Sequence, residues 1–235
     1  MGSTRHVYRQ KPVQVITMEK VILTTFTDPM MGLSYESEPI MDRLQREYGD
    51  KIEFRNVMGL LVRDVSDFMT PEENSLRPEE GIPLYCKRLA GIYKSEESIG
   101  GLPINMEGFC LFDKEHRSSK PLCLAYKAAQ LTNPDRADDF LIGLRHATVI
   151  DCLPTTHFEI ILKVVRETGI DEESFTRYYQ NGSAEKALNE DLAFTRRLGI
   201  HLLPAYLMQY KDKALLIQSF EYHDFVDAID RIIDH

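Results

Sequence analysis

Cysteine is scarce in this sequence, and no two cysteines form a Cys-x-x-Cys motif. The four cysteines are Cys86, Cys110, Cys123 and Cys152, each at least 13 positions from the next. This spacing matches neither the ligand pattern of a zinc site nor a redox motif of neighbouring cysteines. We therefore expect reduced, mostly buried thiols and no metal centre.

The sequence also lacks a long uninterrupted apolar run. The densest apolar stretch near the N-terminus, residues 13–27, is broken by Glu19 and Lys20. Such a stretch is neither the apolar core of a signal peptide nor a membrane-spanning helix. We expect the protein to work in the cytoplasm, without membrane contact.

An excess of positive charge is absent as well. The chain has 28 basic and 37 acidic residues, a net charge of −9. This balance argues against a general surface for nucleic acid or for anionic lipid. With 235 residues, of which 43% are hydrophobic, the chain can bury a core in one domain or in two closely joined ones.

The first periodic segments indicate a β-α-β unit. Residues 1–12 are polar and should form a flexible tail, and a β-like pattern begins at Val13. The β-branched run over residues 21–26 is typical of a central strand, and residues 52–58 alternate like a second strand. The helix between them should be kinked at Pro39.

Helical patterns fill the middle of the chain. One of them opens with a capping box from Thr70 to Glu73, and a second box is expected from Thr156 to Glu159. The end of the chain returns to strands and a last helix, over residues 202–209, 214–220 and 224–233. We predict one sheet domain with an inserted helical subdomain; their limits are 13–65 with 195–235, and 66–194.

The most informative stretch runs from the first strand through a turn at Asp28-Pro29 into a helix. A helix N-terminus exposes N–H groups and a positive dipole end, where many α/β proteins place their chemistry. The flanks resemble the DsbA/FrnE branch of the thioredoxin superfamily, in which such a strand and turn lead to Cys-x-x-Cys, an aromatic residue, and a helix with Glu and Pro. This chain has Met31 and Ser34 at the two cysteine positions, followed by Tyr35, Glu36 and Pro39.

Two later segments extend the resemblance to most of the chain. Residues 198–208 look like the cis-proline loop of this family and its following strand, and residues 119–129 look like its inserted helical domain. The resemblance implies an α/β thioredoxin-like fold with an inserted helical subdomain of the DsbA type. It also implies a cis peptide before Pro204 and a groove that receives an extended peptide beside it.

The predicted groove lacks the sulfur chemistry of the family. By the resemblance, Met31 takes the place of the attacking cysteine, and a thioether neither ionises nor forms a disulfide. A cluster of Met and Leu side chains is instead typical of an adaptable binding surface. The predicted groove residues are Met30, Met31, Leu33, Ser34, Tyr35, Leu202, Leu203 and Pro204.

Ser34 and His201 are the two candidates for residual catalysis. In glutathione transferases of the kappa type, which this family resembles, a serine in the motif steadies the glutathione thiolate; here Ser34 stands at the other end of the four-residue frame. The alternative role for Ser34 is a cap that opens the helix. His201 precedes the expected cis-proline, where it would serve as a general base or as a solvated loop residue.

Three functions remain in competition. The first is non-catalytic binding of a polypeptide or a small apolar ligand in the groove, as in a DsbA-like lineage that serves as an adaptor for the ClpXP protease. The second is thiol-disulfide exchange through a relocated cysteine. The third is a glutathione-dependent reaction through Ser34, the only one of the three that requires a cofactor.

Overall fold

The computed structural model describes residues 19–234 and contains a four-stranded mixed sheet. The expected tail over residues 1–12 and the β-like pattern at Val13 lie outside the described residues. The strands are β1 (Val21–Thr27), β2 (Ile52–Met58), β3 (Ala205–Tyr210) and β4 (Lys213–Ile217). In the order β2-β1-β3-β4, β1 pairs parallel with β2 and antiparallel with β3, and β3 pairs antiparallel with β4. β1, which contains the run predicted as a central strand, is therefore a central strand of the sheet.

Helices cover both faces of the sheet. The α-helices are α1 (Gly32–Glu36), α2 (Glu38–Tyr48), α3 (Pro71–Ser75), α4 (Pro78–Gly100), α5 (Lys120–Thr132), α6 (Ala137–Val149), α7 (Phe158–Glu167), α8 (Glu172–Gln180), α9 (Ser183–Arg197) and α10 (Tyr222–Asp234). Helices α3 to α9 all lie in the chain between β2 and β3. The mixed α/β fold with a helical insertion is thus confirmed. None of the described helices is long and apolar enough to cross a membrane.

Alternate side chains of β1 point to opposite faces of the sheet, and each face is covered by a different group of helices. Leu23 packs with Met208 of β3 beneath α2 and α10. Phe26 lies on the other face, and its ring centroid is 5.6 Å from that of Phe194 in α9. Both faces of β1 are therefore buried, which explains why its sequence is apolar at nearly every position.

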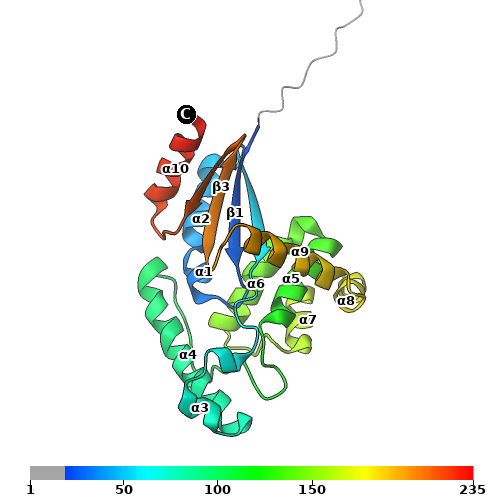
Figure 1. Cartoon of the computed structure of the whole chain (residues 1–235). Helices are drawn as coiled ribbons and strands as arrows, with labels where there is room; N and C mark the ends of the chain where they lie inside the picture. Colours follow the sequence, from blue (N-terminus) through cyan, green and yellow to red (C-terminus); the bar gives the residue numbers. More distant parts are fainter. Residues whose placement is uncertain (1–18, 235) are drawn as a thin grey trace, which may run out of the picture.

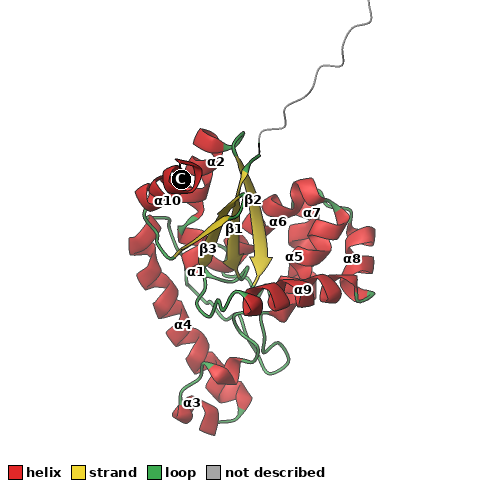
Figure 2. Ribbon diagram, turned by 45° about the horizontal axis from the view of Figure 1, so that its top comes forward, coloured by secondary structure: helices red, strands yellow, loops and turns green. Residues whose placement is uncertain are grey.

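The inserted helices lie beyond the end of the sheet where α1 begins. In Figure 1, α3 and α4 lie on one side of this region, and α5 to α9 lie on the other. Figure 2 shows α5, α7, α8 and α9 gathered together, with α10 beside α2 at the far side of the sheet. The core of the insertion includes the buried rings of Tyr126, Phe140 and Phe175.

The predicted kink at Pro39 is wrong, because the chain breaks before the proline. α1 ends at Glu36, Ser37 separates the two helices, and Pro39 lies in the first turn of α2. In the first turn a proline costs no hydrogen bond, because those N–H groups have no partner within the helix. The Ser37 hydroxyl donates to the Ser34 carbonyl at 2.9 Å and so closes the end of α1.

Two further local predictions have opposite outcomes. The capping box is confirmed at the start of α3, where the Thr70 hydroxyl accepts from the Glu73 N–H and the Glu73 carboxylate accepts from the Thr70 N–H. The box expected from Thr156 to Glu159 is wrong. The Thr156 hydroxyl instead donates to the Leu111 carbonyl at 2.6 Å, a distant contact that local sequence does not reveal.

A buried carboxylate at the end of β1 joins the sheet to the inserted helices. Asp28 is fully buried, and its Oδ1 accepts from the Met30 N–H at 3.1 Å. Its Oδ2 accepts from the Leu61 N–H at 2.8 Å and from the Ser119 hydroxyl at 2.6 Å. The Cys123 thiol also donates to Oδ2 at 3.4 Å. Burial raises the pKa of Asp28 despite these bonds.

We expect Asp28→Ala to lower the free energy of unfolding by about 3 kcal/mol or more, because the N–H groups of Met30 and Leu61 and the Ser119 hydroxyl lose their acceptor. Asp28→Asn keeps one acceptor oxygen and removes the buried charge, so its loss should be smaller. Urea denaturation followed by circular dichroism measures both losses. Asp212→Ala, in the exposed turn between β3 and β4, is the control. Equal losses for the Ala and Asn variants would contradict this view of Asp28.

Candidate functional site

The predicted groove corresponds to a cavity of about 230 Å³ between the start of α1 and one face of α4. We call this cavity the groove. Its walls are mostly apolar and come from four places: the turn into α1, the segments after β2, helix α4 and the cis-proline loop. The lining residues are Met30, Met31, Gly32, Leu33, Leu61, Val62, Phe68, Tyr85, Arg88, Leu89, Ile92, Tyr93, Glu96 and Leu203.

Half of the residues predicted for the groove line it. Met30, Met31, Leu33 and Leu203 do. The other four do not: Ser34, Tyr35 and Pro204 are buried behind the wall, and Leu202 is 68% exposed outside it. The fold therefore brings the turn into α1 next to the cis-proline loop, as expected.

The Leu203-Pro204 peptide is cis, as predicted. β3 begins only after it, at Ala205, rather than at Leu202. Along its length β3 pairs with β1 on one side and with β4 on the other, so it has no free edge. Within the described chain, Leu202 and Leu203 make no backbone hydrogen bond to other backbone groups. An added strand would therefore have only this short segment for pairing, less than we expected.

Met31 occupies the N-cap of α1 and is only 5% exposed. Its sulfur accepts a weak contact from the Ser34 hydroxyl at 4.0 Å. Since a thioether has no acidic proton, the positive end of α1 has nothing to ionise at this position. The groove thus offers packing rather than nucleophilic chemistry at its centre.

Ser34 does not cap the helix, so that prediction is wrong. The N-cap is Met31, and it makes no side-chain cap bond. Ser34 is 2% exposed, and its hydroxyl lies 2.7 Å from the Thr27 hydroxyl. Arg145 donates to the same Thr27 oxygen at 3.0 Å. A thiolate in the groove has no direct access to a hydroxyl that is buried and engaged in this way.

His201 is exposed in the loop before the cis-proline, and it is not part of the groove wall. Among the residues that line the groove there is no nucleophilic side chain for this histidine to activate. A catalytic role for this histidine stays a prediction.

Helix α4, which forms a whole wall of the groove, was not predicted from sequence. Its buried side chains include Ile82, Tyr85, Leu89 and Tyr93, spaced by three and four residues, and this was the available signal. The proline inside the helix, Pro83, obscures it.

Two contacts hold α4 against α1. The Tyr93 hydroxyl donates to the Met30 carbonyl at 2.5 Å. The buried Glu36 carboxylate accepts from the N–H groups of Gly100 and Leu102, at 3.0 and 3.1 Å. These contacts fix the C-terminal half of α4 beside the turn into α1.

Glu96 is the one acidic side chain in the groove wall. Its Oε2 is buried and, among the described residues, has no hydrogen-bond partner. Gly32 makes room for it, since a Cβ at that position would lie 2.1 Å from this oxygen. Burial, together with the nearby charge of Glu36, raises the pKa of Glu96 to about 7.

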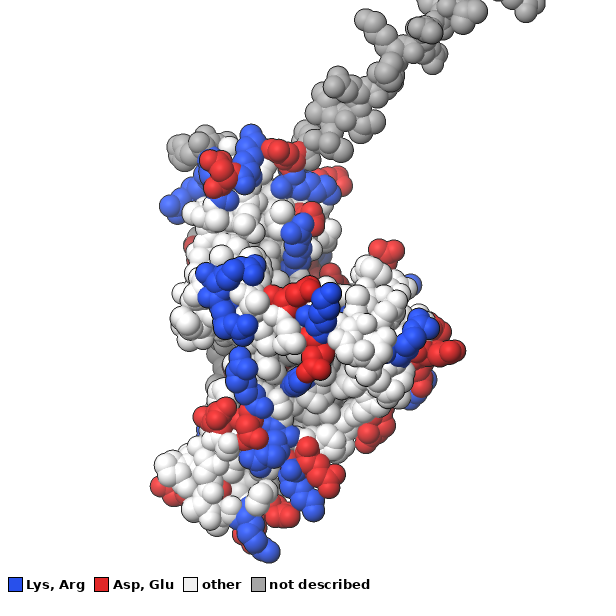
Figure 3. Space-filling view, turned by 45° about the vertical axis from the view of Figure 1, so that its right-hand side comes forward, with Lys and Arg blue, Asp and Glu red and all other residues white. Residues whose placement is uncertain are grey.

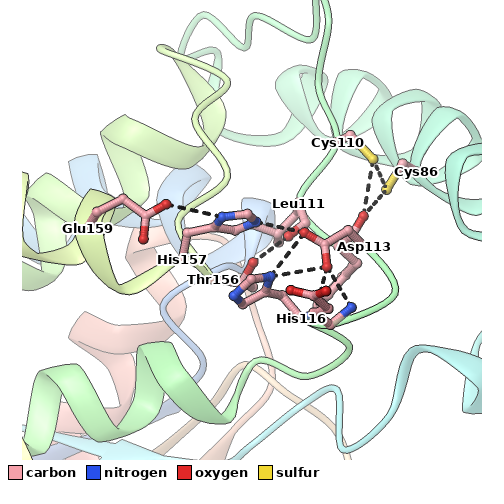
Figure 4. A network of polar contacts seen from close by, with 10 residues as sticks. Cys86, Cys110, Leu111, Asp113, His116, Thr156, His157 and Glu159 are labelled. Atoms are coloured by element: carbon pink, nitrogen blue, oxygen red, sulfur yellow. Dashed lines mark hydrogen bonds and ion pairs between the residues drawn. The ribbon is translucent and has the colours of Figure 1, made fainter. Parts of the chain in front are cut away.

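A second polar cluster, which sequence spacing did not reveal, lies in the insertion. Asp113, His116 and His157 bring their oxygen and nitrogen atoms within 4.8 Å of one another (Figure 4). The Asp113 carboxylate lies 3.0 Å from His116 Nδ1 and 2.8 Å from His157 Nε2. Two imidazoles and one carboxylate suit a cation such as Zn²⁺, but here they bond one another.

Comparisons with known proteins agree with the fold. The protein-family model Thioredoxin_5, described as Thioredoxin, matches residues 24–227. The ClpXP adapter protein SpxH of Halalkalibacterium halodurans is 22% identical over 229 residues, which cover 96% of this chain and 69% of that protein. The protein of the same name from Shouchella clausii is 25% identical over 183 residues, which cover 78% of this chain and 56% of that protein.

Solved structures share the fold at low sequence identity. A candidate protein disulfide isomerase from Nitrosomonas europaea has a TM-score of 0.72 and 18% identity, covering 91% of this chain and 98% of its own. The cytosolic disulfide reductase DsbM from Pseudomonas aeruginosa has a TM-score of 0.65 and 15% identity, covering 89% and 98%. Since the family model matches most of the chain and the fold agrees with these structures, the chain belongs to the thioredoxin family described by that model and is a DsbA-like thioredoxin-fold protein.

Proposed function

We propose that this protein binds an extended polypeptide in the groove and does not change it chemically. The observation that carries the proposal is the apolar groove between α1 and α4, with the thioether of Met31 at the helix start. By the family resemblance, Met31 stands at the position of the attacking cysteine. An apolar cavity without a nucleophile is suited to binding.

The size of the groove favours a side chain of a larger partner over a whole small molecule. Its volume of about 230 Å³ lies below the roughly 300–1,000 Å³ of typical small-ligand sites. A peptide that pairs with the backbone of Leu202 and Leu203 would place one side chain into this space. Covering about 300 Å² of apolar surface would contribute roughly 7 kcal/mol before ordering costs, which is compatible with weak to moderate affinity.

The charge distribution supports a protein partner. On the face seen in Figure 3, basic and acidic side chains are interspersed and neither sign forms a continuous surface. The net charge of −9 favours a neutral or basic polypeptide, whose association should slow as salt is added. We still expect no nucleic-acid partner.

An adaptor role is the form of this function that we favour. The relatives from Halalkalibacterium halodurans and Shouchella clausii carry the name ClpXP adapter protein. By analogy, we propose that this chain presents a bound polypeptide to a ClpXP-type protease in the cytoplasm. The glutathione alternative is weaker, because the hydroxyl of Ser34 is buried and hydrogen-bonded outside the groove.

Ile92→Glu tests the groove as the binding surface. Ile92 lines the groove, whereas Ile99 of the same helix does not, and both are 44% exposed. A charge at position 92 should weaken binding of a fluorescent, extended apolar peptide by about tenfold or more, since an apolar contact worth about 1.5 kcal/mol is lost. Fluorescence anisotropy measures the dissociation constants.

Ile99→Glu is the matched control for this measurement. It introduces the same charge at equal exposure, also within one helical turn of Glu96, and should leave the dissociation constant within about twofold, as expected for a site outside the contact. If both variants weaken binding equally, or neither does, the peptide does not bind in the groove.

The ionisation of Glu96 should make stability depend on pH. Its pKa is about 7 in the folded protein against an ordinary value of 4.5, so the folded state holds this proton more tightly. Its contribution to stability is therefore complete below pH 4.5 and is lost as pH rises to about 7. Between pH 5 and pH 8 the wild type should lose stability relative to Glu96→Gln, as measured by urea denaturation.

Glu97→Gln serves as the control for the pH experiment. The hydrogen bond from Lys94 lowers the pKa of Glu97 from its ordinary value of 4.5, so the contribution of this side chain to stability is lost only at lower pH. The stability difference between wild type and Glu97→Gln should therefore stay constant between pH 5 and pH 8. A wild type that keeps a constant stability difference from Glu96→Gln over this range would show that Glu96 ionises normally.

A further inference from the structure

Two cysteines that lie far apart in the sequence meet inside the helical insertion. Cys86 lies on α4, and Cys110 lies in the segment between α4 and α5. Their sulfur atoms are 2.7 Å apart, in the hydrogen-bonded contact of two thiols seen in Figure 4. Both sulfur atoms also lie near the Phe112 carbonyl oxygen, which is 3.6 Å from Cys86 Sγ and 3.2 Å from Cys110 Sγ.

The other two cysteines make different contacts. Cys123 donates to the Asp28 carboxylate, and Cys152 donates to the Asn105 carbonyl at 2.8 Å. Cys86 and Cys110 are therefore the only two of the four cysteines, all of which the structure describes, whose sulfurs contact each other.

The two thiols of the pair differ in access to solvent. Cys86 is 1% exposed, whereas Cys110 is half-buried and lines an open cavity of about 610 Å³ beside His116 and His157. A small molecule in this cavity reaches Cys110 first and finds Cys86 directly behind it. The hydrogen bond between the thiols also lowers the pKa of Cys110 and raises that of Cys86. The accessible thiol is thus the better nucleophile near neutral pH.

We propose that Cys86 and Cys110 form a redox-active pair that exchanges with small-molecule disulfides, with Cys110 as the attacking thiol and Cys86 as the resolving thiol. This site is separate from the groove and does not depend on the polypeptide-binding function. It adds an activity to a chain whose position 31 cannot perform that chemistry.

The exchange balances without any other reagent. The Cys110 thiolate attacks one sulfur of the small disulfide, the bond between its two sulfurs breaks, and the leaving thiolate takes up the proton that Cys110 lost. Cys86 then attacks the Cys110 sulfur and releases the second small thiol, which takes the Cys86 proton. The protein loses two electrons and two protons, and one disulfide becomes two thiols.

The test uses the full-length protein in buffers of reduced and oxidised glutathione, followed by alkylation of free thiols and peptide mapping by mass spectrometry. We expect the wild type to form the Cys86–Cys110 disulfide. Cys86→Ser should instead retain glutathione on Cys110, because the resolving thiol is missing. Cys110→Ser should form neither product at position 86.

Cys123→Ser and Cys152→Ser are the controls, and both should form the Cys86–Cys110 disulfide as the wild type does. Even if a variant fails to fold, the presence or absence of the Cys86–Cys110 disulfide in the wild-type peptide map tests the proposal. Alkylation of all four cysteines throughout the buffer series, or glutathione that settles on Cys152 in preference to Cys110, would overturn the proposal.

Discussion

The burial of one carboxylate, that of Asp28, is the constraint on which the rest of the structure depends. A buried carboxyl group requires hydrogen-bond donors, and here they come from three separate segments: the turn into α1, the chain after β2 and the start of α5. Because these donors belong to both the sheet and the inserted helices, the two parts must assemble around a common point. The raised pKa of Asp28 reflects how completely this point excludes water.

The hydrogen bonds of Asp28 also determine the shape of the groove. Asp28 binds the Met30 N–H, and Tyr93 of α4 binds the Met30 carbonyl, so the peptide units around Met30 are held from both sides. Met31 follows at once, as the N-cap of a short helix whose positive end faces the groove. In a thioredoxin-like fold, such an arrangement would activate a cysteine. With a thioether in place, the same rigid geometry provides a preorganised apolar wall.

Helix α4 connects the two sites that we propose. Tyr85 and Leu89 of this helix line the groove. Cys86, which follows Tyr85 directly, contacts Cys110 of the segment after the helix. A 23-residue helix with its C-terminal end bound by Glu36 is well suited to this double role, because it positions distant side chains on one stiff element. The chemistry of sulfur and the binding of apolar groups are thereby separated in space.

Sequence alone determined the features that depend on local pattern. The central strand and the capping box at Thr70 follow from residue type and spacing within short segments, whereas the cis peptide before Pro204 follows from the family resemblance of its segment. Only the tertiary structure decided which distant groups meet, such as Cys86 with Cys110 and Asp113 with His157. The physical reason is that periodicity reports which face of an element is apolar, whereas the packing of whole elements decides which polar atoms come together. For the same reason, half of the residues predicted for the groove do not line it. A strand, a turn and a helix can be located from sequence, but the rotation of α1 against α4 cannot.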